Sequence, residues 1–151
     1  MMDKATEVRI KVFQALNGFK FNNVEIPVFD EVVNSETPIP SVGGAQQVYI
    51  MLQDQQVVYN PIQTQCASRF DVNLTIKMVT IFGVDGSKKL SEDIGHQLLK
   101  LIRDNRGGSK IDGVQRVDLN INRSMNETTP TNTAFSKIYI LTFVVNDYSE
   151  E

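Results

Sequence analysis

A run of alternating side chains constrains the fold of this chain more than any other feature of its sequence. Between Arg69 and Phe82, apolar residues such as Val72, Leu74 and Ile76 alternate with polar ones. A two-residue period puts one set of side chains on each face of a β-strand, so that one face is buried and the other meets solvent. The segment therefore predicts a long, half-buried antiparallel strand.

Helical periodicity is present in two other segments. Apolar side chains recur at helical spacing in residues 4–17, with Asp3 as N-cap and Asn17-Gly18 as a C-terminal stop. The same spacing in residues 90–103 follows a glycine-containing turn at residues 83–86 and predicts a second amphipathic helix. The apolar stripe of each helix needs a surface to cover, and the apolar face of the predicted sheet provides one.

Four further segments have the composition of strands. Residues 24–33 contain Pro27, which lacks an amide hydrogen and so favours a sheet edge. Residues 48–52, 113–123 and 135–147 are rich in β-branched and aromatic residues. The order helix, strands, helix, strands predicts a single α+β domain of 151 residues, with a mostly antiparallel sheet and two helices packed on one face.

Long polar segments connect these elements. Residues 34–47, 53–68 and 123–134 contain small polar residues, and each is at or beyond the length at which a structureless loop becomes unusual in a compact domain. We expect them to be loops or hairpin arms that become ordered against a neighbouring molecule. Residues 148–151 are expected to form a frayed tail.

Residues that usually catalyse reactions or bind metals are sparse. His96 is the one histidine and Cys66 the one cysteine, which excludes two-histidine zinc sites and internal disulfides. We expect His96 to be an exposed helix residue. The glycines at 43–44 and 83–86 lack the following lysine and hydroxyl residue of a phosphate-binding loop, and we interpret them as turns. We therefore predict no enzymatic activity, no cofactor and no metal.

Charge and hydropathy limit the partners of the chain. The net charge is -3 and the sequence pI is about 5.2, so no uniform positive field attracts nucleic acid. No segment approaches the ~20 apolar residues of a membrane helix, and charges near the N-terminus interrupt a signal peptide. We expect no membrane contact. A more basic region, which we interpret as a mixed charged surface, comprises Arg103, Arg106, Lys110, Arg116 and Arg123.

Two short motifs lie in the first half of the chain, Ile26-Pro27-Val28-Phe29-Asp30-Glu31-Val32 and Val48-Tyr49-Ile50-Met51-Leu52. With the order of predicted elements, they resemble the small tail-completion and tail-terminator proteins of tailed phages. That family has a V-P-V-Y-D-x-V type strand and a P-Y-V-x-L type strand after an N-terminal helix. The chain departs from the family pattern in having no tryptophan and in having Gln46-Gln47 in place of a proline.

The resemblance implies a structural virion protein: a tail terminator, tail-completion protein or head-tail connector of the neck. It implies a homo-oligomeric ring, sixfold or twelvefold, that contacts other neck or tail proteins and is assembled in the host cytoplasm. DNA would pass the lumen without specific binding. We expect the polar segments to form the contacts between subunits, and the expected contact residues are Pro27, Thr37, Pro38, Pro40, Gln47, Gln55, Tyr59, Pro61, Asn126, Thr129 and Pro130.

Two other functions remain open at the level of sequence. One is a small ligand-binding or enzymatic domain that uses no His or Cys chemistry, for which a saturable thermal shift with a metabolite or nucleotide would be the sign. The other is a nucleic-acid-binding accessory protein, based on the basic residues from Arg103 to Arg123. A retarded band at low salt would favour that function.

Overall fold

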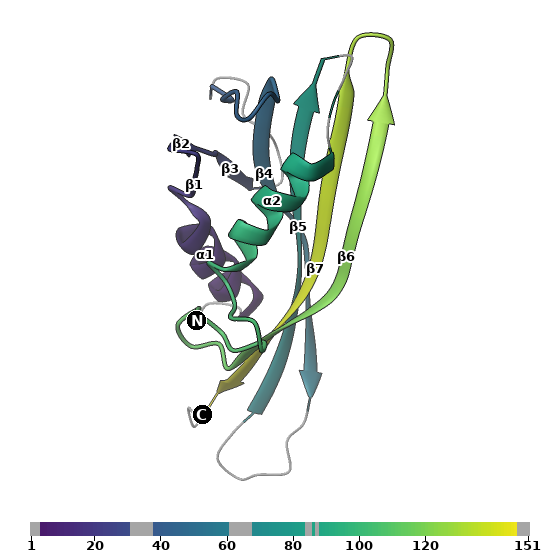
Figure 1. The fold of residues 1–151 in the computed structure, drawn as a ribbon. Helices are drawn as coiled ribbons and strands as arrows, with labels where there is room; N and C mark the ends of the chain where they lie inside the picture. Colours follow the sequence, from purple (N-terminus) through teal and green to yellow (C-terminus); the bar gives the residue numbers. More distant parts are fainter. Residues whose placement is uncertain (1–3, 31–37, 61–67, 84–85, 87, 148–151) are drawn as a thin grey trace.

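The main feature of the computed structural model is a five-stranded sheet with the strand order β3-β4-β5-β7-β6 (Figure 1). We call it the main sheet. The structure describes residues 4–30, 38–60, 68–83, 86 and 88–147. The elements are α1 (Lys4–Leu16), β1 (Lys20–Phe21), β2 (Val24–Glu25), β3 (Val28–Asp30), β4 (Gln47–Asn60), β5 (Ser68–Phe82), α2 (Lys88–Leu99), β6 (Arg116–Thr128) and β7 (Thr133–Asp147).

The two helices cover one face of the main sheet (Figure 1). α1 contacts β4 and β5, and α2 contacts β5 and β7. Beneath them, Val72, Leu74, Ile76 and Met78 of β5 are at most 1% exposed. The β4–β5, β5–β7 and β6–β7 pairs are antiparallel, and the short β3 lies parallel to β4. The predicted α+β fold, with a mostly antiparallel sheet and both helices on one face, is confirmed.

Local sequence explains where the helices end. α1 stops at Leu16, and Gly18 has a φ of 88°, a left-handed conformation that glycine adopts without strain. α2 ends at Leu99, earlier than the predicted residue 103. The amides of Ile102 and Arg103 both bond to the carbonyl of Leu99, so a tight turn continues the chain past the last α-helical residue.

The segment at residues 24–33 is not one strand. β2 pairs with β1 in a small hairpin, and Asn22 and Asn23 adopt φ angles of 52° and 64° at its turn. Asparagine tolerates this left-handed region better than most residues. The chain then passes through Ile26 and Pro27 before β3, so the proline separates two short strands. Residues 31–33 lie outside the described residues.

Two polar segments predicted as loops or hairpin arms are largely strand. β4 continues to Asn60, and β6 continues to Thr128, so that residues 129–132 alone join β6 to β7. Residues 53–60 are therefore part of a hairpin arm, one of the two expected forms, whereas the polar loop expected from residue 123 begins only at residue 129, because its prediction relied on apolar alternation. Side chains at 54–56 and 125–128 are exposed, so no apolar face marks these strands in the sequence. Residues 61–67 lie outside the described residues.

A bulge in β6 changes which face its side chains occupy. Leu119 pairs with Leu141 on the helix-covered face, whereas Ile121 pairs with Ile140 on the opposite face. The extra residue, Asn120, shifts the register between them. Simple alternation from Val117 would have placed Leu119 and Ile121 on the same face. The bulge at Asn120 interrupts this alternation.

Candidate interaction surface

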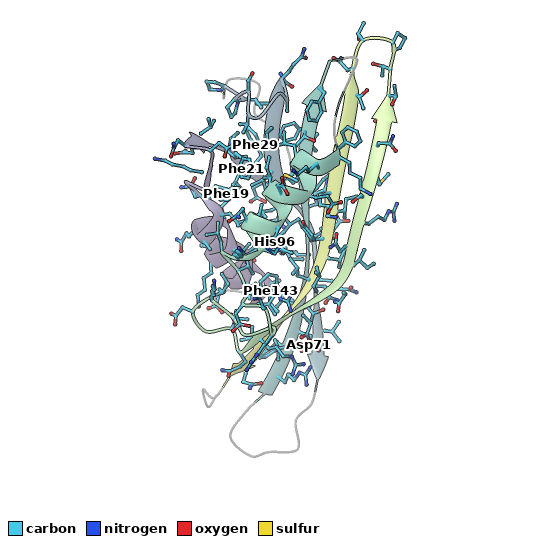
Figure 2. The ribbon with its side chains drawn as sticks, viewed as in Figure 1. Phe19, Phe21, Phe29, Asp71, His96 and Phe143 are labelled. Atoms are coloured by element: carbon cyan, nitrogen blue, oxygen red, sulfur yellow. The ribbon has the colours of Figure 1, made fainter. Side chains whose placement is uncertain are left out.

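The residues considered for chemistry in the sequence lie apart in the part of the chain that the structure describes. No three His, Cys, Asp or Glu side chains there are placed to hold a metal ion. His96 is exposed on α2 (Figure 2), and Cys66 lies outside the described residues. Gly43 and Gly44, with φ angles of 57° and 94°, form the tight turn between Val42 and Ala45. Neither described helix has the length and apolar character to cross a membrane.

A groove of about 450 Å³ lies along the outer side of α1. Its lining includes Ile10 and Phe13, and the Arg9–Asp30 ion pair stands at one side. Ile10 is 40% exposed. The other lining residues are Thr6, Gln14 and Asn17, so polar side chains surround the apolar part of the groove.

The face of the main sheet opposite the helices, which we call the open face, carries most of the exposed apolar side chains. Val58, Ile121 and Met125 are 41%, 42% and 45% exposed, and they are three of the four large apolar residues exposed within the described part. Each pairs across the sheet with a residue of the open face: Val58 with Asp71, Ile121 with Ile140 and Met125 with Ser136. Val58 lies on β4, whereas Ile121 and Met125 lie on β6, so the exposed apolar side chains stand at the two sides of this face.

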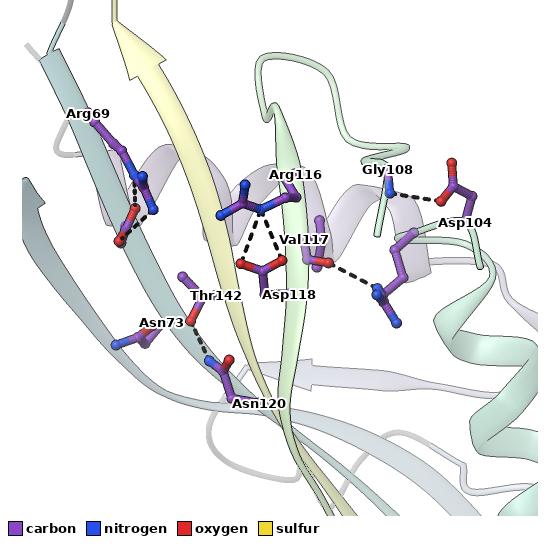
Figure 3. A network of polar contacts seen from close by, with 11 residues as sticks. Arg69, Asn73, Asp104, Gly108, Arg116, Val117, Asp118, Asn120 and Thr142 are labelled. Carbon is purple, nitrogen blue, oxygen red and sulfur yellow. Dashed lines mark hydrogen bonds and ion pairs between the residues drawn. The ribbon is translucent and has the colours of Figure 1, made fainter. Parts of the chain in front are cut away.

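A polar row crosses the open face at another level (Figure 3). The hydroxyl of Thr142 on β7 donates to Asn73 Oδ1 on β5 at 2.7 Å and accepts a hydrogen bond from the Asn120 amide on β6. Two ion pairs lie near it, Arg69–Asp71 at 2.9 Å and Arg116–Asp118 at 3.0 Å. Each guanidinium therefore has a carboxylate beside it.

The basic region predicted from sequence has mixed charge. The Arg103 Nε donates to the carbonyl of Val117 at 3.0 Å, and Arg116 pairs with Asp118. The backbone amides of Arg106 and Gly108 donate to Asp104, and these hydrogen bonds lower the pKa of its carboxyl group. Asp104 is therefore a stable negative charge among these cations. The arrangement agrees with a mixed charged surface.

A buried cation attaches α2 to the β6–β7 hairpin on the helix-covered face. Lys137 is 5% exposed, and its Nζ donates to Glu92 at 2.6 Å and to the Ser124 hydroxyl at 3.0 Å. The hydrogen bond from Lys137 lowers the pKa of Glu92. Burial, and then the charge of Glu92, raises the pKa of the neighbouring Tyr139. These contacts join helix and hairpin across three elements.

The outer edge of β4 is covered along its first half. The carbonyls of Pro40 and Pro27 accept hydrogen bonds from Val48 and Ile50 at 3.2 and 3.0 Å, and β3 continues this edge. Where β3 ends, the Arg9 guanidinium donates to the carbonyls of Leu52 and Gln53. From residue 54 to residue 60, no described segment pairs with this edge.

The outer edge of β6 is covered only at its start. The carbonyl of Gly107 accepts a hydrogen bond from Val117 at 3.0 Å, and Gly108 bridges to Arg116. From residue 118 to residue 128, this edge has no strand partner among the described residues. A long unpaired edge is a template for strand addition.

The expected contact residues fall into two groups at opposite edges of the main sheet. Pro27, Pro40, Gln47 and Gln55 lie beside or in β4, and Pro38 shortly precedes Pro40. The second group, in and beyond β6, contains Asn126, Thr129 and Pro130, all of them exposed. Thr37 and Pro61 lie outside the described residues, and Tyr59 is described only as part of the β4 backbone. Their role in subunit contacts stays a prediction.

Sequence reasoning placed Asp54, Val58 and Met125 inside the polar segments expected to form contacts, without singling them out individually. It missed Ile121, which it placed with Leu119 on one strand face and which the bulge turns to the open face. Met125, an isolated apolar residue within a polar segment, was one available signal, and the adjacent pair Val57-Val58 was another.

The comparisons with known proteins give a shared fold. No protein-family model matches the sequence, and no curated protein matches it. A chain in the solved structure of the virion of a native gene transfer agent (GTA) particle has the same fold, with a TM-score of 0.57 and 9% sequence identity. The likeness covers 95% of this chain and 99% of that chain. It therefore extends over nearly the whole chain.

Proposed function

We propose that this chain is a structural protein of a phage-like virion, located at the neck or at the head-proximal end of the tail. In this role it is a tail terminator, a tail-completion protein or a head-tail connector. Its copies form a ring, sixfold or twelvefold, that contacts other neck or tail proteins. The chain itself catalyses no reaction in this role.

The observation that carries the proposal is the likeness of nearly the whole chain to a chain of a GTA virion. The element order expected for tail-terminator and tail-completion proteins points in the same direction. Two strand edges without a strand partner among the described residues, and exposed apolar side chains on the open face, suit a protein that works in an assembly. The net charge of -3 suits a channel through which DNA passes without binding.

Native mass spectrometry and negative-stain imaging of the purified full chain test the proposal. We expect rings of one defined stoichiometry, either alone or after mixing with the proteins encoded by neighbouring genes. DNA should give no retarded band at low salt. A chain that stays monomeric at high concentration and binds none of those proteins would contradict the proposed function.

A further inference from the structure

We propose that the free edge of β6 in one copy pairs with the free edge of β4 in the next copy, forming a continuous sheet around the ring. This inference rests on the proposed function and adds the contact by which the ring closes. The two edges are residues 118–128 of β6 and residues 54–60 of β4.

The position of the two edges sets the symmetry of the contact. β4 and β6 lie on opposite sides of β5 and β7 in the main sheet, and no described residue pairs with the outer edge of β4 beyond β3. A contact between two different edges of identical molecules is heterologous. Such a contact repeats from copy to copy until the rotation closes a ring.

Strand direction allows good hydrogen-bond geometry at this contact. β4 is antiparallel to β5, β5 to β7, and β7 to β6. β4 and β6 of one copy therefore run in opposite directions. Rotation about an axis along the strands preserves direction, so β6 meets β4 of the next copy as an antiparallel neighbour. The open face of each copy then continues into the next.

Charge favours this pairing over a pairing of β6 with itself. Arg123 is exposed at the middle of the free β6 edge, and its described side-chain contact is the Met125 sulfur at 3.6 Å. A twofold β6–β6 pair over residues 118–128 would place Arg123 opposite its own copy, and like charges opposite each other destabilise a sheet. The free β4 edge instead offers Asp54, which is exposed and has no ion pair among the described residues.

Placing Arg123 beside Asp54 fixes a register. Residue 121 then lies opposite residue 56, and Ile121 and Gln56 both belong to the open face, since Gln56 pairs with Asn73. Ile121 also comes near Val58 of the neighbouring copy, which would cover two of the exposed apolar side chains. Within one copy, Arg123 lies at the level of Met51 across the sheet. Because the contact places Arg123 beside residue 54 of the next copy instead, neighbouring copies are shifted along the strands. Strands that are tilted to a ring axis show such a shift.

A charge swap tests the contact with the full chain. Arg123→Glu and Asp54→Lys should each raise the protein concentration needed for ring assembly at least tenfold. Native mass spectrometry across a dilution series measures this concentration. The double variant Arg123→Glu/Asp54→Lys should restore assembly. Lys20→Glu reverses an exposed cation in the β1–β2 hairpin, outside both edges of the main sheet, and should assemble like the wild type. Rings that form equally well in both single variants, or a double variant without recovery, would overturn the edge pairing.

Cysteine cross-linking tests the register independently. In a Cys66→Ser background, Gln56→Cys and Ile121→Cys together should give a ladder of disulfide-linked oligomers on mild oxidation, whereas either cysteine alone should give none beyond dimer. Rings that remain in native spectra without a ladder would overturn this contact and leave the proposed function intact. A wild-type chain that forms no ring, alone or with neck and tail partners, would instead refute the proposed function.

Discussion

The two faces of the main sheet place similar side chains in opposite environments. On the helix-covered face, Ile76 and Leu74 of β5 are at most 1% exposed. On the open face, Ile121 and Met125 of β6 are 42% and 45% exposed, and the polar row through Thr142 lies nearby in the same surface. The first face holds the molecule together, whereas the second leaves apolar side chains exposed.

This difference shows how one strand can serve two purposes. In β5 the even-numbered residues from Val72 to Met78 are buried on the helix-covered face, whereas odd-numbered residues such as Arg69 and Lys77 are half-buried on the open face. Because side chains alternate between faces, substitutions on the open face can change contacts with partners at little cost to the core. The comparison predicts that stability and assembly respond to different sets of residues.

The largest loss of stability should come from truncating a buried side chain on the helix-covered face. Ile76→Ala removes a fully buried side chain and should lower the free energy of unfolding by about 4 kcal/mol, since transfer and cavity costs add. Ile121→Ala, its counterpart on the open face, should cost at most about 1 kcal/mol. Urea unfolding at one protein concentration measures both. Equal losses would show that the two faces are equally packed in the isolated molecule.

Sequence periodicity predicted the covered face well and the open face poorly. The alternation from Arg69 to Phe82 identified β5 because one of its faces is buried under helices. The ends of β4 and β6 lack that burial, so their polar residues resembled loops. The bulge at Asn120 was also hidden, since nothing local in Leu119-Asn120-Ile121 distinguishes a bulge from regular alternation. Long-range pairing, rather than local propensity, determines these features.

The next largest loss of stability is expected where α2 closely approaches β7. A Cβ atom at Gly95 would lie 2.0 Å from the Tyr139 hydroxyl and 3.1 Å from its ring carbon Cζ. Gly95→Ala should therefore destabilise the chain by about 2 kcal/mol, although alanine favours the helix. In a Tyr139→Phe background the same change should cost about 0.5 kcal/mol or less, because the clashing oxygen is gone. A double-mutant cycle without coupling would contradict this close packing.

Removing the carboxylate partner of the buried Lys137 should destabilise the chain more than removing Lys137 itself. Glu92→Gln leaves an ammonium group that is 6% exposed without its carboxylate and should cost about 1.5 kcal/mol. Lys137→Met leaves Glu92, which is 41% exposed and can be hydrated, and should cost less. Thermal or urea unfolding at neutral pH distinguishes these variants. A larger loss of stability in Lys137→Met than in Glu92→Gln would mean that water reaches the Lys137 ammonium group.

The same ion pair predicts a dependence of stability on pH. Glu92 has a lowered pKa in the folded chain, so its contribution to stability is complete above its ordinary pKa of 4.5 and is lost as the pH falls through the folded value. The wild type should therefore lose more stability on acidification than Glu92→Gln. Unfolding curves recorded on both sides of that pKa provide the measurement. Parallel losses in the two proteins would exclude a role for this carboxylate.

The smallest loss of stability should come from a substitution in the polar row on the open face. Thr142→Val removes the hydroxyl that joins Asn73 to Asn120, yet both amides are near solvent and can bond to water, so we expect a cost of about 0.5 kcal/mol. Thr75→Val is the matched control, because Thr75 shares this face and has no side-chain hydrogen bond among the described residues. A loss above about 2 kcal/mol for Thr142→Val alone would mean that the row is shielded from water even in the isolated chain. The open face would then be part of the folded core and could not be a surface reserved for neighbouring copies.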